Sequence, residues 1–340
     1  MAAGLVRATA GHGGGWPWRD ERAGSCYLYI ESTHILFDLQ AETTAEESMS
    51  TLPYPMLADW VITSAKRSEN SLVQLCQENL KSALTLSQSL PDMYNWETIS
   101  PETFKTNVTQ TNNIHCFNYE FWRDWSKNCD AYSVMLYWRA IEIINPVTRA
   151  INQKDYVAAA ILARSLLELV SSYLLNANFI LRAVKDAVQV SEQLAVCPEC
   201  EEFIVKAIWG RRFLEPGNAH KQINALTHVQ RLSKSPNAEL LWPMYEFLCE
   251  VAHPNVVGYA RFWQDEAADL PSGAQIREIS RQASGSVQQE LLNNTLWALS
   301  FGAAGIKNSY RLINDALSDL MPWIEREGNL CRVQSKSAAT

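Results

Sequence analysis

The sequence is poor in glycine, proline and charge. Its 340 residues include 14 glycines and 13 prolines, too few for a disordered chain or for an all-β chain built on many tight turns. Charged residues make up 19%, and 29 Lys and Arg against 37 Asp and Glu give a net charge of −8. This balance argues against a global electrostatic grip on nucleic acid, so no DNA partner is expected, although a local basic patch stays compatible with it.

Several catalytic motifs are missing. The sequence contains neither the Gly-x-x-x-x-Gly-Lys-Ser/Thr phosphate loop nor the Gly-x-Gly-x-x-Gly dinucleotide fingerprint. It also has no Gly-x-Ser-x-Gly nucleophile elbow and no His-Glu-x-x-His zinc motif. Nucleotide binding through those loops, and hydrolysis by either of the last two sites, are therefore unsupported.

The N-terminus lacks the apolar run of a signal peptide, and the eight cysteines are scattered instead of forming a dense framework. The longest charge-poor stretch, 157–178, contains Arg164 and Glu168, whose charges are expensive at bilayer depth. We therefore expect a cytoplasmic protein with reduced thiols and no membrane span.

Composition divides the chain into four parts. Residues 1–53 form a Gly-rich flexible tail with room for a short hairpin, since six of the 14 glycines precede residue 25. Residues 54–129 form an N-terminal helical region, 130–327 a helical core, and 328–340 a frayed tail.

Apolar residues recur at three-and-four spacing over most of 56–325, which predicts an all-α, up-and-down helical bundle. Asp130, Asp155 and Asn237 are expected to cap helices, and Pro146 to kink or break one. The predicted helices are 56–84, 132–152, 156–190, 219–232, 238–252, 275–302 and 305–324, the last two parted at Gly302 and Gly305. Residues 101–130 show no clear period, and 264–273 are expected to be a loop.

One predicted helix carries an isolated pair of charges. The segment from Tyr156 to Leu175 is apolar nearly all the way round, so it should be central and buried. Its only charges, Arg164 and Glu168, are four residues apart and share a face. Two interpretations stay open: an internal ion pair that fixes the register of the helix, or a functional polar pocket.

A second polar group ends another predicted helix. Tyr245, Cys249 and His253 lie four residues apart on one face, and Glu250 can reach His253. Proline follows His253, so the helix ends there, at the negative end of its dipole. His253 is then either an acid/base group or a plain helix terminator.

These two segments, Ala163-Arg-Ser-Leu-Leu-Glu168 and Tyr245 to His253-Pro-Asn255, resemble a group of bacterial and phage-associated helical proteins loosely similar to HEPN-type domains. The resemblance covers 130–305. It implies a HEPN-like bundle that brings Arg164 and Glu168 near Tyr245 and His253, and it implies a homodimer. Many HEPN domains are ribonucleases whose signature is an Arg followed a few residues later by a His. Here that spacing occurs only at Arg7 and His12, in the Gly-rich tail.

Cys197 and Cys200 have the spacing of half a zinc site. A structural site needs two more ligands, and no second Cys-x-x-Cys exists in the sequence. A redox pair and ordinary thiols at a helix start are the alternative interpretations.

Three hypotheses for the function follow. The first is an interaction or regulatory component of a bacterial defence or toxin–antitoxin type system, including phage defence, without catalysis of its own. The second is a metal-independent ribonuclease acting on RNA, in which His253 is the acid/base group and Arg164 stabilises charge. Its candidate site residues are Arg164, Glu168, Tyr245, Glu250, His253 and Asn255. The third is a scaffold stabilised by zinc on Cys197 and Cys200.

Overall fold

The computed structural model describes residues 54–67, 71–109, 113–190, 193–195, 197–210, 224–281 and 285–337. The predicted tail and hairpin in 1–53 lie outside these residues, as does the Arg7–His12 pair.

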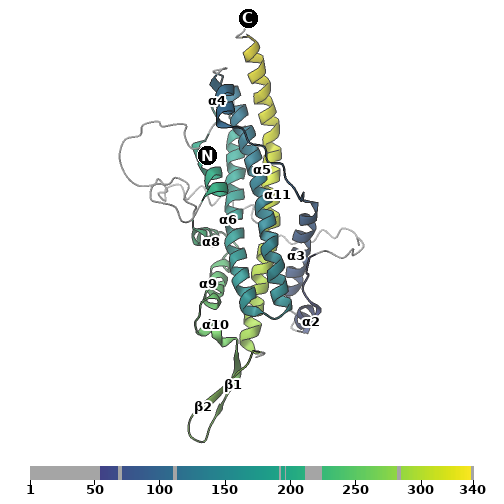
Figure 1. Ribbon diagram of the computed structural model, residues 1–340, viewed down its shortest axis with the longest axis vertical. Coiled ribbons are helices and arrows are strands. Elements are labelled where there is room, and N and C mark those ends of the chain that lie inside the picture. Colours follow the sequence, from purple (N-terminus) through teal and green to yellow (C-terminus); the bar gives the residue numbers. More distant parts are fainter. Residues whose placement is uncertain are drawn as a thin grey trace, which may run out of the picture.

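Three long helices form the body of the protein. α5 (Ile114–Asn152), α6 (Tyr156–Val188) and α11 (Ser286–Ser337) run side by side along the long axis of the molecule (Figure 1), and each contacts the other two. α3 (Ser71–Ser89) packs against α11 and α5. The described chain is therefore mainly helical, as the periodicity of the sequence predicted.

Shorter helices cover this body. α8 (Ala225–Leu232) and α9 (Leu241–Ala252) pack on α6, and α10 (Val256–Ala260) packs on α9. α2 (Asp59–Arg67) precedes α3, and α4 (Pro101–Thr109) packs on α5. α7 (Pro198–Ile204) continues into a π-helical turn, Val205–Trp209.

α6 has a central position, as predicted: it contacts α5, α8, α9 and α11. α11 shares this position, since it contacts α3, α5, α6 and α9. In the described part of the chain α6 is the one helix long and apolar enough to cross a membrane by length and composition. Half of its most apolar window is buried inside the bundle, and a core helix meets the same criteria. The packing of α6 between four helices favours the core interpretation.

The predicted start of α5 is wrong. The helix begins after Asn113, whose side chain accepts a hydrogen bond from the backbone N–H of His115. Asp130 lies inside the helix and caps nothing; its carboxylate accepts a hydrogen bond of 2.5 Å from the hydroxyl of Tyr94. Pro146 also lies inside α5 and does not break it.

The predicted break at Gly302 and Gly305 is wrong as well, because α11 runs through both glycines. They are sites of close approach to α6. A Cβ at Gly302 would lie 2.4 Å from Cδ2 of Leu166, and one at Gly305 would lie 2.4 Å from Cγ1 of Val170. Glycine here removes the side chain that would hold the two helices apart.

The stretch before α11 is a β-hairpin, where a loop and a helix start at 275 were predicted. β1 (Trp263–Asp269) pairs antiparallel with β2 (Gln275–Ile279), and the turn places Gly273 at φ 80°. The hairpin projects from one end of the bundle (Figure 1). Asn237 is the last correction: it has φ 63° in a turn, and α9 begins at Leu241.

Candidate functional site

The structure brings together three of the predicted site residues. Nε of Arg164 donates to Oε1 of Glu168 at 3.3 Å, and the hydroxyl of Tyr245 donates to the same oxygen at 2.6 Å. The guanidinium of Arg164 also lies 5.7 Å from the centre of the Tyr245 ring. We call these three residues the α6–α9 cluster, since they join those two helices.

The α6–α9 cluster is half-buried and not sealed in the core. The side chains of Arg164 and Glu168 keep 32% and 27% of their accessible surface, so the prediction that this pair is buried is wrong. Burial, together with the hydrogen bond to Glu168, raises the pKa of Tyr245. The phenol therefore stays protonated at neutral pH and acts as a hydrogen-bond donor to the carboxylate.

His253 lies apart from this cluster. It ends α9 in an extended conformation (φ −89°, ψ 148°), and its backbone N–H donates to the carbonyls of Cys249 and Glu250, both at 3.2 Å. Its side chain is exposed. It follows Tyr245 by eight positions along the helix, a rise of about 12 Å. In the described ranges, no hydrogen bond or ion pair joins His253 to the α6–α9 cluster.

Glu250 and Asn255 build the corner between α9 and α10. The Asn255 side chain accepts from the backbone N–H groups of Val257 (3.0 Å) and Gly258 (3.1 Å) and donates to Oε2 of Glu250 at 2.5 Å. A Cβ at Gly258 would lie 2.8 Å from the carbonyl oxygen of His253. The corner therefore needs both the Asn cap and the glycine, so each has a structural role.

Cys197 and Cys200 occupy the start of α7. Cys197 is half-buried and donates from Sγ to Oε2 of Glu199 at 3.0 Å, whereas Cys200 is buried. Burial raises the pKa of Cys200 and of the neighbouring thiol of Cys129 on α5. Among the residues that the structure describes, no group of three or more His, Cys, Asp or Glu side chains is arranged to hold a metal ion.

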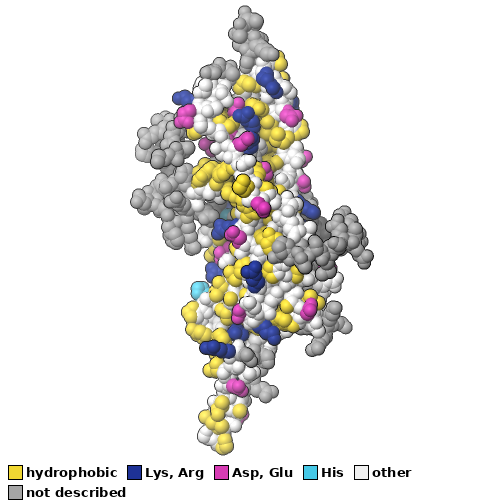
Figure 2. Space-filling model, turned by 45° about the vertical axis from the view of Figure 1, so that its right-hand side comes forward, with side chains coloured by type: hydrophobic (Ala, Val, Ile, Leu, Met, Phe, Trp, Pro, Cys, Tyr) yellow, Lys and Arg dark blue, Asp and Glu magenta, His cyan; other side chains and the backbone are white. Residues whose placement is uncertain are grey.

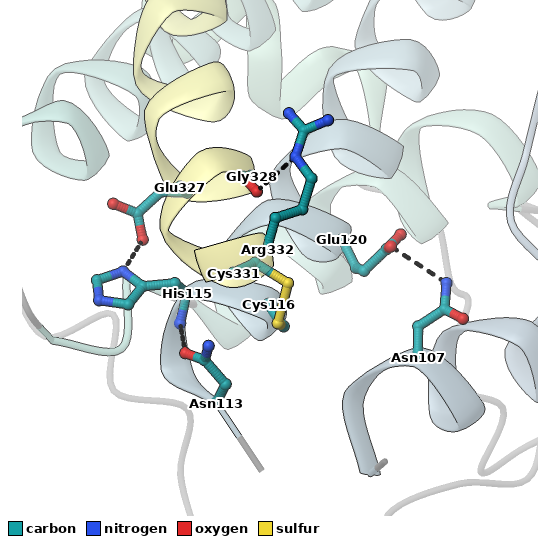
Figure 3. Close-up of a disulfide and its surroundings, with 9 residues drawn as sticks. All are labelled: Asn107, Asn113, His115, Cys116, Glu120, Glu327, Gly328, Cys331 and Arg332. Atoms are coloured by element: carbon teal, nitrogen blue, oxygen red, sulfur yellow. Dashed lines mark hydrogen bonds and ion pairs between the residues drawn. A yellow bond between two sulfur atoms is a disulfide. The ribbon is translucent and has the colours of Figure 1, made fainter. Parts of the chain in front are cut away.

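A second polar cluster, which the sequence analysis missed, lies toward the end of the bundle away from the hairpin. A disulfide joins Cys116 on α5 to Cys331 on α11, across 215 residues of sequence. Four residues before Cys331, Glu327 pairs with Nδ1 of His115 at 2.8 Å, and both side chains are nearly buried (2% and 8% exposed). Figure 3 shows the disulfide and the two side chains pointing toward each other.

We call this second cluster the α5–α11 clasp. Asn118 belongs to it, because its amide nitrogen donates to Glu327 at 3.1 Å and to the carbonyl of Gln193 at 2.9 Å. The clasp corrects two predictions: the thiols of Cys116 and Cys331 are not reduced, and 328–337 continue α11 instead of fraying. No pattern within 101–130 or 328–340 pointed to a pairing of such distant residues.

Exposed apolar side chains gather at the end of the molecule that carries α10 and the hairpin. Val256, Tyr259, Ile276 and Ile279 keep 61%, 52%, 54% and 72% of their surface. Figure 2 shows hydrophobic side chains along the hairpin and on the adjoining part of the bundle. Next to them an open hollow of about 360 Å³ lies between α9, α10 and α11, lined mainly by apolar side chains such as Phe247 and Leu291.

Comparison of the chain with protein-family models, with curated proteins and with solved structures finds no match.

Proposed function

We propose that the chain is an interaction component that binds another protein through the α10 and hairpin end and has no catalysis of its own. The observation that carries this proposal is the hairpin itself. All five residues of β2 are exposed, two of them isoleucines, on an element that projects from the bundle. Exposed apolar side chains gathered at one end of a molecule mark interaction sites, and Val256 and Tyr259 of α10 add to the two isoleucines here. A two-stranded hairpin alone is only marginally stable in water.

The placement of the candidate acid/base residues supports the same proposal. Arg164 and Glu168 of α6 contact Tyr245 of α9, while His253 lies at the C-terminal end of α9. A ribonuclease would need Arg164 and His253 to face one substrate phosphate. The resemblance of the α6 and α9 segments to HEPN-type proteins favours a role in a bacterial defence or toxin–antitoxin type system.

The test combines expression in a bacterial host with partner capture in the cells the protein comes from. Wild type, His253→Ala and Ile276→Glu/Ile279→Glu are compared for growth, integrity of total RNA and co-purified proteins. We expect intact RNA in every case, and one co-purified protein that the double isoleucine variant loses while its melting temperature stays unchanged. Loss of RNA with wild type but not with His253→Ala would overturn the proposal in favour of the ribonuclease.

A further inference from the structure

The two edges of the hairpin are not equivalent. Pairing is regular over Ala267, Ala268 and Asp269 of β1, but the register shifts between Trp263 and Ala267. This irregularity interrupts β1, whereas β2 is continuous from Gln275 to Ile279. In the described part of the chain the sheet has two strands, and no described residue pairs with the outer edge of β2, where backbone N–H and C=O groups can accept a further strand.

Side chains alternate along this edge. Arg277 and Ile279 share one face with Trp263 of β1, which stands opposite Ile279 and lies 5.5 Å from the Arg277 guanidinium. Ile276 and Glu278 occupy the other face. The edge thus offers an apolar residue at each end and two opposite charges between them, all exposed.

A second copy of the chain fits this edge poorly. Two copies of β2 that pair edge to edge around a two-fold axis are antiparallel, and the axis passes through a residue that faces itself. A central axis places Arg277 opposite Arg277, or Glu278 opposite Glu278. Like charges directly opposite each other destabilise a sheet, so charge works against self-pairing.

We propose that the outer edge of β2 takes up an extended segment of another protein as a third, antiparallel strand. Charge complementarity defines this segment, read from its N-terminus, as apolar, basic, acidic, apolar. Its basic residue faces Glu278, its acidic residue faces Arg277, and its apolar residues face Ile279 and Ile276. The segment supplies the backbone partners that the edge lacks and turns a marginal hairpin into a three-stranded sheet. This inference rests on the proposed function and names the mode of binding.

The test uses four synthetic peptides and NMR spectra of the labelled full-length protein. The first peptide, Thr-Val-Lys-Glu-Val-Thr, has the predicted pattern. The second has Lys and Glu exchanged, the third is N-methylated on the amides that would face β2, and the fourth is scrambled. We expect the first, at millimolar concentration, to shift the amide resonances of 275–279, and the exchanged peptide to bind roughly tenfold more weakly. The N-methylated and scrambled peptides should cause no shift, because the backbone bonds or the register are lost.

A charge-swapped variant, Arg277→Glu/Glu278→Arg, is the matched control. It keeps the composition of the exposed hairpin and should reverse the preference between the first two peptides. Absence of shifts with every peptide, or equal shifts with the N-methylated one, would overturn strand addition. A protein dimer that Ile276→Glu dissolves would overturn it in favour of a second copy. The partner-capture experiment tests whether this end of the molecule binds a protein, whatever the mode of binding. If the isoleucine variant loses the partner but no peptide causes shifts, strand addition is refuted and the proposed function stands.

Discussion

Substituting Gly302 by Ala tests the close approach of α11 to α6. In an open helix this change stabilises by about 1 kcal/mol, because alanine has the higher helix propensity. Here the new Cβ would lie 2.4 Å from Cδ2 and 2.6 Å from Cγ of Leu166, distances that real carbon contacts do not reach. Leu166 is fully buried, so it has little room to yield.

The clash should outweigh the gain in propensity. Overpacking of a filled core costs about 1–3 kcal/mol, so after the gain in propensity we expect Gly302→Ala to lower the free energy of unfolding by up to about 2 kcal/mol. Urea denaturation followed by far-UV circular dichroism measures this difference. Ala304→Gly, two residues further along α11 at a half-buried site, measures the helix-propensity effect in the same helix.

A double-mutant cycle isolates the contact. Leu166→Ala alone should cost about 2–5 kcal/mol, because it leaves a cavity. In the double variant the new Cβ has space, so the two costs should fall short of additive by about 1–2 kcal/mol. If Gly302→Ala instead raises stability by the amount that Ala304→Gly lowers it, the two helices do not touch at this glycine and the argument is refuted.

Three further predictions concern buried groups. Burial lowers the pKa of His228 from 6.5 to about 4, so between these pH values the unfolded chain binds a proton that the folded protein does not. The free energy of unfolding should therefore fall by up to about 3 kcal/mol as the pH drops from 6.5 to 4. His228→Leu should flatten this pH dependence in denaturation curves measured across the range. Tyr245→Phe removes the donor to the half-buried carboxylate and should cost about 1 kcal/mol in the same assay, whereas His253→Ala, at an exposed helix end, should stay within about 0.5 kcal/mol of wild type; the reverse order would contradict the assigned contacts. Cys331→Ser opens a loop of 215 residues, and the lost loop-closure entropy should lower the free energy of unfolding by up to about 5 kcal/mol and the melting temperature with it. A reducing agent should lower the melting temperature of the wild type and leave that of Cys331→Ser unchanged.

The sequence predicts best where one signal dominates. α6 begins at Tyr156 as predicted, because the apolar run is continuous and starts directly after Asp155, although that side chain makes no capping hydrogen bond. α9 ends where the proline after His253 requires it. Both boundaries depend on local chemistry that no tertiary contact overrides.

The sequence predicts poorly where the buried side chains are polar. The first part of α5 shows no apolar period because the buried positions include His115, Asn118 and Asn128, which bond to distant segments. A glycine inside a helix has the same ambiguity. Gly302 looks like a break in the sequence, and only the neighbouring helix shows that it is a contact.

The candidate site was predicted in part for the same reason. The pairing of Arg164 with Glu168 follows from helical spacing alone. Their exposure depends on where α9 lies, which spacing does not give. The sequence predicts a helix where β2 lies, because a strand exposed on both faces lacks the alternation of apolar and polar residues that identifies strands.

The contacts at the base of the hairpin determine how far the effect of a bound strand can spread into the bundle. At its base, Ser280 donates its backbone N–H to the carbonyl of Phe262 at 2.8 Å, and the side chain of Gln288, in the first turns of α11, donates to the carbonyl of Arg261. The Arg261 guanidinium also lies 5.8 Å from the ring of Tyr156, at the start of α6. The base is thus fixed to two core helices, while among the described elements β1 and β2 mainly contact each other. A third strand added to β2 would therefore order the hairpin and leave the contacts among α5, α6 and α11 unchanged.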